Sequence, residues 1–78
     1  MTAYKERLRQ KMSIHFLSTR KQMDISQETM AELLEIDPRS YFNLEHGKNL
    51  CSTTVFLNYL QNCNVNAEQL LADLFQLE

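Results

Sequence analysis

Two histidines and two cysteines are the residues of this chain best suited to nucleophilic catalysis or metal binding: His15, His46, Cys51 and Cys63. A catalytic nucleophile needs a base beside it, and a zinc site needs its ligands at short, regular spacing. These four residues have neither arrangement. A loop that cradles phosphate needs several glycines, and the chain has one. We therefore expect no enzyme, no metal and no cofactor.

The cysteines also bear on the compartment in which the protein works. Cys51 and Cys63 stand at the two ends of a segment whose pattern is helical. A helix of that length separates their Cα atoms by about 18 Å, beyond the limit of about 7 Å for a disulfide. No apolar run is long enough for a membrane span, and the charged N-terminus precedes no apolar signal core. We expect free thiols and a cytoplasmic protein without membrane segments.

Length and composition indicate the type of fold that positions these residues. The chain has 78 residues, of which 44% are hydrophobic and 23% charged, with one Gly and one Pro. This is the size of one small domain, spanning residues 1–78, and it offers little turn punctuation for a β fold. We expect a compact all-α fold.

Apolar periodicity and capping residues divide the chain into five predicted helices. In the first, Tyr4, Leu8, Met12 and Phe16 share one face. The predicted ranges are 3–23, 27–34, 38–46, 53–63 and 67–77. The expected N-caps are Ser26, Asp37, Ser52 and Asn66, and Gly47 is expected to end the third helix.

The charges are strongly polarised along the chain. Six of the eight basic residues lie in residues 1–23, and six of the ten acidic residues lie in residues 24–47. Residues 1–15 therefore form a basic N-terminal part of the first helix. The middle segment repels phosphate unless its acids are paired or turned away.

Only Glu35 and Ile36 separate the second predicted helix from the Asp37 cap of the third, so two short helices meet at a tight corner. This is helix-turn-helix geometry over residues 26–46. Ala31 is small enough to let the two helices approach closely. The predicted core behind the corner consists of Met30, Leu34, Ile36, Tyr41 and Leu44.

The segment TRKQMDISQETMAELLEIDPRSYFNLEHGKNL, residues 19–50, resembles the lambda-repressor and Cro-like (XRE-type) helix-turn-helix regulators. The resemblance extends over residues 16–75 and the order of five helices. Its most specific parts are Ser26–Gln27, Ala31, Ile36 and Glu45–His46–Gly47. It implies a transcriptional regulator that binds double-stranded DNA, as a homodimer, with the third helix in the major groove.

The resemblance also implies roles for individual residues. Arg39 is expected to read guanine, Asn43 to pair with adenine, and Phe42 to contact a thymine methyl group. Ser40 is suited to a phosphate or base oxygen, and Pro38 lies beside these residues at the helix start.

Contacts with the DNA backbone are expected on either side of this set. Gln27 matches the family's phosphate contact at the start of the second helix, assisted by the amides there. Lys48 and Asn49 are candidates in the loop after the third helix. Arg20 and Glu45 match a partly buried ion pair that fixes the third helix in orientation.

Several residues depart from the family's pattern. Asp24 and Glu35 stand where the family often or usually has Gly, at positions that favour positive φ. Glu28, Glu32, Glu35 and Asp37 place negative charge around the corner that would face DNA. An alternative is therefore a protein-interaction module on the same fold, antitoxin-like or a co-regulator, with weak or no DNA binding. The fifth helix carries surplus apolar residues for a partner or a second copy: Leu70, Leu71, Leu74, Phe75 and Leu77.

Overall fold

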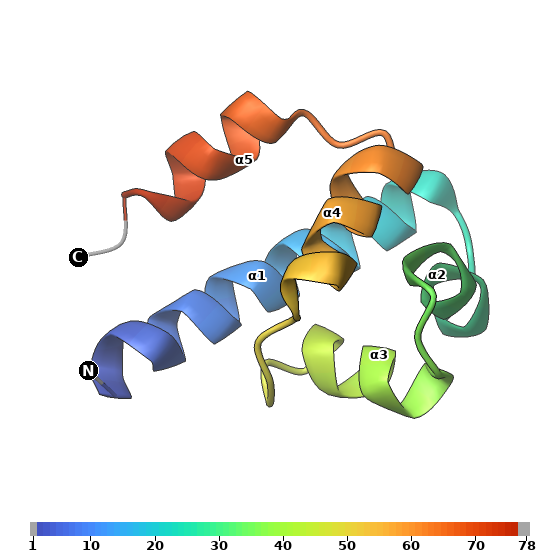
Figure 1. The fold of residues 1–78 in the computed structure, drawn as a ribbon, viewed down its shortest axis with the longest axis horizontal. Coiled ribbons are helices and arrows are strands. Elements are labelled where there is room, and N and C mark those ends of the chain that lie inside the picture. Colours follow the sequence, from blue (N-terminus) through green and yellow to red (C-terminus); the bar gives the residue numbers. More distant parts are fainter. Residues whose placement is uncertain (1, 77–78) are drawn as a thin grey trace.

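The computed structural model describes residues 2–76, which fold into five helices and contain no strand (Figure 1). The helices are α1 (Thr2–Met23), α2 (Gln27–Leu34), α3 (Pro38–Glu45), α4 (Thr53–Asn62) and α5 (Ala67–Leu74). The described part measures 32 × 25 × 21 Å along its principal axes. The predicted compact all-α fold is confirmed. None of the helices within residues 2–76 combines the length and apolar content that crossing a membrane requires.

Helices α2 to α5 each begin at the predicted capping residue. The side chain of each cap accepts a hydrogen bond from the backbone N–H three residues later, which satisfies a donor that has no partner within the helix. The bonded pairs are Ser26 with Thr29, Asp37 with Ser40, Ser52 with Val55, and Asn66 with Gln69.

Three helices end in the same backbone motif. After α1, α2 and α3 the chain enters the left-handed region at Asp24 (φ 58°), Glu35 (φ 61°) and Gly47 (φ 71°). At Glu35, the amides of Glu35 and Ile36 donate to the carbonyls of Glu32 and Ala31, which is the Schellman pattern. Asn64 (φ 55°) also adopts this conformation after α4. Two of these positions carry acids where glycine would be free of strain.

Three helices end earlier than predicted. Helix α3 stops at Glu45 and α4 at Asn62, with His46 and Cys63 as caps. Helix α5 ends at Leu74, three residues before the predicted end, because Gln76 N–H donates to the Asp73 carbonyl and so tightens the last turn. Leu77 lies outside the described residues.

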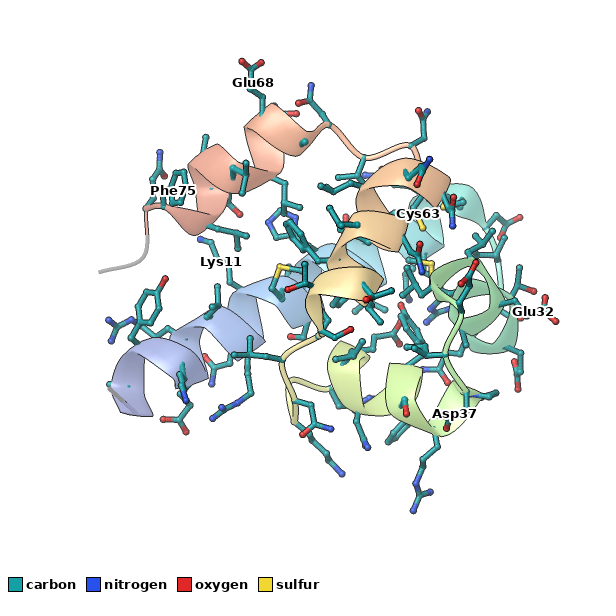
Figure 2. The ribbon with its side chains drawn as sticks, in the orientation of Figure 1. Lys11, Glu32, Asp37, Cys63, Glu68 and Phe75 are labelled. Carbon is teal, nitrogen blue, oxygen red and sulfur yellow. The ribbon has the colours of Figure 1, made fainter. Side chains whose placement is uncertain are left out.

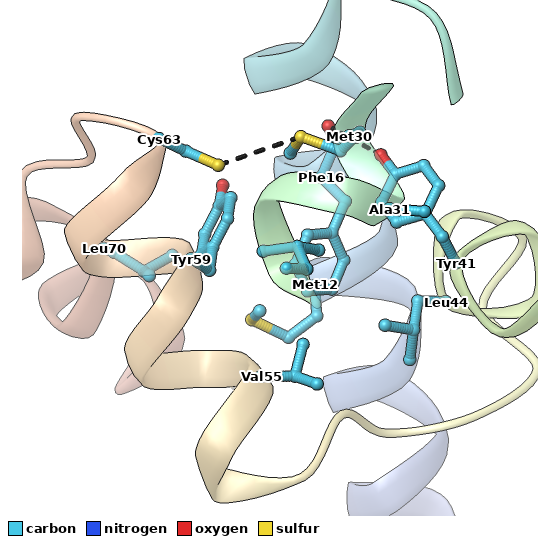
Figure 3. Close-up of a cluster of buried hydrophobic side chains, with 11 residues drawn as sticks. Met12, Phe16, Met30, Ala31, Tyr41, Leu44, Val55, Tyr59, Cys63 and Leu70 are labelled. Atoms are coloured by element: carbon cyan, nitrogen blue, oxygen red, sulfur yellow. Dashed lines mark hydrogen bonds between the residues drawn. The ribbon is translucent and has the colours of Figure 1, made fainter. Parts of the chain in front are cut away.

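The core lies where α1, α2, α3 and α4 meet (Figure 3). Phe16 on α1 is 1% exposed and meets Tyr41 and Tyr59 edge to face, with ring centroids 6.1 and 4.7 Å apart. Ala31 is 1% exposed, as expected for the close approach of two helices. Tyr4 was predicted on the apolar face of α1 but is 47% exposed, because the N-terminal turns of α1 extend past α3 and α4 (Figure 1).

Polar side chains attach α4 to the end of α2. The Asn58 and Asn62 amides donate to the carbonyl oxygens of Leu34 and Leu33, at 3.1 and 2.8 Å. Those carbonyls belong to the last turn of α2, where no amide of the helix donates a hydrogen bond to them. Helix α4 therefore holds the C-terminal end of α2, and with it the corner that leads to α3.

Helix α5 packs against α1 through one buried side chain and a set of charges. Leu70 is 3% exposed. Asp73 accepts from His15 at 2.5 Å and lies 3.3 Å from the ammonium of Lys11, which points toward α5 (Figure 2). These hydrogen bonds lower the pKa of Asp73, and the bond from His15 has the larger effect.

Candidate nucleic-acid interface

Helices α2 and α3 form the predicted corner, with the turn built from Glu35, Ile36 and Asp37. Glu35 supplies the left-handed residue, the half-buried Ile36 packs against the core, and Asp37 caps α3. One face of α3 carries the buried Tyr41 and Leu44. The opposite face is therefore presented to solvent.

A buried carboxylate fixes α3 to α1. Glu45, whose side chain is 4% exposed, accepts from Arg20 Nε at 2.7 Å and from a second guanidinium nitrogen at 3.2 Å. The third guanidinium nitrogen donates to the Ile25 carbonyl at 3.0 Å. Since the guanidinium is planar and rigid, these three bonds set the position of α3 relative to the end of α1.

Two further side chains complete the shell of Glu45, and sequence reasoning assigned neither of them to it. The Tyr41 hydroxyl donates to Glu45 at 2.6 Å, and the Gln27 amide donates at 2.8 Å. Burial raises the pKa of Glu45, but the hydrogen bonds from Arg20, Tyr41 and Gln27 outweigh it and hold the pKa below its ordinary value. Glu45 is thus a fully bonded carboxylate that ties α1, α2 and α3 together.

Most of the residues predicted to meet bases lie on the outer face of α3. Pro38, Arg39, Ser40 and Phe42 are exposed, and Asn43 is half-buried. Arg39, Phe42, Asn43 and His46 follow the three- and four-residue spacing of a single helix face. The structure therefore brings the predicted base-reading side chains onto one continuous strip.

Ser40 is already occupied within α3. Its hydroxyl donates to one Asp37 oxygen at 2.7 Å while its amide donates to the other at 3.1 Å. Both bonds lower the pKa of Asp37, and the bond from the hydroxyl has the larger effect. The carboxylate of Asp37 therefore keeps its negative charge at the tip of α3. Because the Ser40 hydroxyl already donates its one hydrogen bond to Asp37, it can only accept a further hydrogen bond.

The C-terminal end of the strip contains an aromatic pair that sequence reasoning missed. The rings of Phe42 and His46 are stacked, with centroids 3.9 Å apart and planes at 28°. Lys48 Nζ lies 5.8 Å from the centroid of the Phe42 ring. The four-residue spacing of Phe42 and His46 on a predicted helix is the signal that would have shown this contact.

The family model of the helix-turn-helix domain matches residues 15–75. The chain belongs to the helix-turn-helix domain family. The match covers the second half of α1 and all of α2 to α5, so it includes the Glu45 network and the outer strip of α3. Compared with curated proteins and with solved structures, the chain finds no significant match.

As in other members of this family, the expected partner of the helix-turn-helix is DNA, and the charges around the corner bear on that partner. Glu28, Glu32, Glu35 and Asp37 are all exposed, and Glu32 and Asp37 mark the acidic side of α2 and the tip of α3 in Figure 2. Glu45 is withdrawn from this group because its charge is paired with Arg20. Exposed cations lie in the last turn of α1, in α3 and in the loop after α3, at Lys21, Arg39 and Lys48.

Proposed function

We propose that this helix-turn-helix domain is a sequence-specific regulator of the lambda-repressor and Cro-like (XRE) type, which inserts α3 into the major groove of double-stranded DNA. The observation that carries the proposal is the exposed strip of α3 on a helix whose other face is clamped by Glu45. Recognition needs side chains held in fixed positions, since any freedom lost on binding weakens the complex. A catalytic role is not part of the proposal.

Base recognition is assigned to the strip. The exposed Arg39 presents its guanidinium fork to guanine N7 and O6, and Asn43 presents its amide to adenine. Phe42 contacts a thymine methyl group with its exposed ring. Pro38 begins the helix beside the groove, and Ser40 serves as an acceptor through the hydroxyl oxygen that remains after its bond to Asp37.

Phosphate contacts are assigned to Gln27, Lys48 and Asn49. One Gln27 N–H is bonded to Glu45, which leaves the second N–H and the amides at the start of α2 for a phosphate oxygen. Lys48 and Asn49 are exposed in the loop after α3. In this arrangement Gln27 bonds to both Glu45 and a DNA phosphate. Contact with the DNA backbone is therefore linked to the orientation of α3.

We further propose a homodimer formed through the outer face of α5. Phe75 is 79% exposed and Leu71 is 37% exposed, which supports the surplus of apolar surface inferred from the sequence. Leu70 belongs to the core and is not available, and Leu74 lines an apolar groove with Leu8 and Phe56. A two-fold dimer would space two α3 helices about 34 Å apart on one face of the duplex.

Sedimentation of the intact protein and of a double variant, Leu71→Glu with Phe75→Glu, tests the dimer. A dimer that the double variant abolishes supports the interface. A monomeric wild type at high concentration, or a variant that still dimerises, places the interface elsewhere or removes it.

The alternative is an interaction module without strong DNA binding, antitoxin-like or a co-regulator. The exposed acids of α2 and Asp37 favour it, because phosphate neutralisation supplies most non-specific affinity. The cytoplasmic location predicted from the sequence belongs equally to both proposals.

Fluorescence anisotropy with random and selected duplexes at two salt concentrations separates the two functions. A regulator binds a selected duplex more tightly than random DNA and loses affinity as salt rises. Absence of binding to any duplex at low salt would exclude the first function and leave the second.

A further inference from the structure

The recognition strip contains one side chain without an assigned role, His46. Its ring covers one face of Phe42, with centroids 3.9 Å apart, although Phe42 remains 38% exposed. An exposed phenylalanine on a helix can exchange rotamers unless a neighbour blocks it. The stacked imidazole occupies the space on one side of the ring, so it restricts Phe42 before any partner arrives.

His46 is itself held by the backbone. Its Nδ1 lies 2.9 Å from the carbonyl oxygen of Phe42, at the last turn of α3. A carbonyl oxygen can only accept, so Nδ1 carries the proton in this bond and the imidazole plane is oriented by the helix end. The left-handed Gly47 then returns the chain so that Lys48 Nζ lies 5.8 Å from the Phe42 centroid, within cation–π range. The closer of the two contacts is the stacked His46 ring, which therefore restricts Phe42 more than the Lys48 ammonium does.

We propose that His46 is a positioning residue for base selection, which makes Phe42 discriminate thymine by its 5-methyl group at one position of the DNA site. The inference deepens the proposed function and rests on it. Because the stacked imidazole restricts the Phe42 side chain on folding, less of the contact energy is lost to immobilising the ring on binding. Without the imidazole, Phe42 still supplies apolar surface, but it no longer directs that surface at one methyl group.

The test uses the full chain and duplexes selected from random sequence. Each thymine of a selected duplex is replaced in turn by deoxyuridine, which pairs identically and lacks only the methyl group. At one position, we expect wild-type affinity to fall about fourfold, the value of burying one methyl group. Phe42→Ala should show no methyl dependence at that position.

Two His46 variants then separate positioning from general structure. His46→Ala should fold and unfold like wild type in circular dichroism yet lose most of the methyl discrimination. His46→Tyr, which restores a ring that can stack on Phe42 but lacks the Nδ1 bond that orients that ring, should recover part of the discrimination.

Several results would overturn the inference. These are undiminished methyl discrimination in His46→Ala, equal weakening of that variant on all duplexes, or no recovery in His46→Tyr. A wild-type protein that binds selected duplexes without methyl dependence at any thymine removes the inference but leaves the proposed function. Failure to bind any duplex removes both.

Discussion

The Glu45 carboxylate of α3 receives two hydrogen bonds from the Arg20 guanidinium of α1, at 2.7 and 3.2 Å. The pair is almost shielded from water, with side chains 4% and 17% exposed. Tyr41 and Gln27 satisfy the remaining acceptor capacity of the carboxylate. Removal of either charge would leave the other buried and unpaired, which is costly in a way that removal of both is not.

Glu45→Ala should therefore destabilise the fold by about 3 kcal/mol, because Arg20 loses its partner while it stays largely covered. Replacing both residues, with Arg20→Met and Glu45→Leu, should cost less than the sum of the single replacements. Denaturant unfolding of the wild type, of Arg20→Met, of Glu45→Leu and of the variant with both changes gives the coupling energy in a double-mutant cycle. Glu32→Ala, an exposed acid on α2, is the control and should change stability by about 0.5 kcal/mol or less. Small additive losses at both sites would contradict the pair.

Acid should weaken the fold through the same carboxylate. The folded pKa of Glu45 lies below its ordinary value of 4.5, so the unfolded chain binds a proton more readily than the folded one. The contribution of Glu45 is complete above that ordinary value and is lost as pH falls through the lowered folded value. Urea unfolding between pH 7 and pH 3 should show a fall in stability that is smaller in Glu45→Gln. Identical pH profiles for the two proteins would show that Glu45 does not carry the effect.

Arg39→Ala should reduce affinity for a selected duplex by about 1 to 3 kcal/mol and relax the preference at one base pair, since a bidentate guanine contact is lost. Competition binding with duplexes that vary one base pair at a time measures both effects. Arg7→Ala removes an exposed basic side chain from the N-terminal part of α1 and should keep the wild-type base-pair preference. Unchanged specificity in Arg39→Ala would remove Arg39 from base reading.

Lys48→Ala should weaken binding to all duplexes alike and reduce the slope of log affinity against log salt by about one, because a phosphate contact carries no base information. Anisotropy titrations on selected and random duplexes at several salt concentrations give the two slopes. A loss confined to one sequence would argue instead that Lys48 acts through its neighbour Phe42.

Glu35→Gly should stabilise the fold by up to about 1 kcal/mol, since glycine adopts φ 61° without the steric cost borne by glutamate. The same change removes an exposed negative charge beside the tip of α3, so affinity for random DNA should rise as well. Glu28 is an exposed acid in the first turn of α2, and Glu28→Gln is the matched control, since it removes a negative charge without changing a residue in the left-handed conformation. A Glu35→Gly protein that is less stable than wild type would refute the strain argument.

Local signals accounted for most of the fold that was predicted from sequence. Ser26, Asp37, Ser52 and Asn66 marked the helix starts because a capping bond spans only three residues. The helix ends were predicted less accurately than the starts. Helix α5 stops at Leu74 because backbone hydrogen bonds tighten its last turn, and no side-chain pattern indicates those bonds.

The candidate site was partly accessible from sequence. The structure contains the Arg20–Glu45 pair, which the family resemblance implied. The bonds of Tyr41 and Gln27 to Glu45 could not be derived from spacing, since they depend on how α1, α2 and α3 pack. Ser40 was assigned to DNA from its position alone, while its hydroxyl is bonded to Asp37.

The side-chain caps at the starts of α2 to α5 also have a consequence for the rate at which the chain folds. Each cap biases its own segment toward helix through a contact between residues three apart. The slow part of folding is the closure of long loops. In this chain that step brings together helices whose ends are already fixed by their caps. We expect this chain to refold in about microseconds to milliseconds, as small helical proteins with mostly local contacts do.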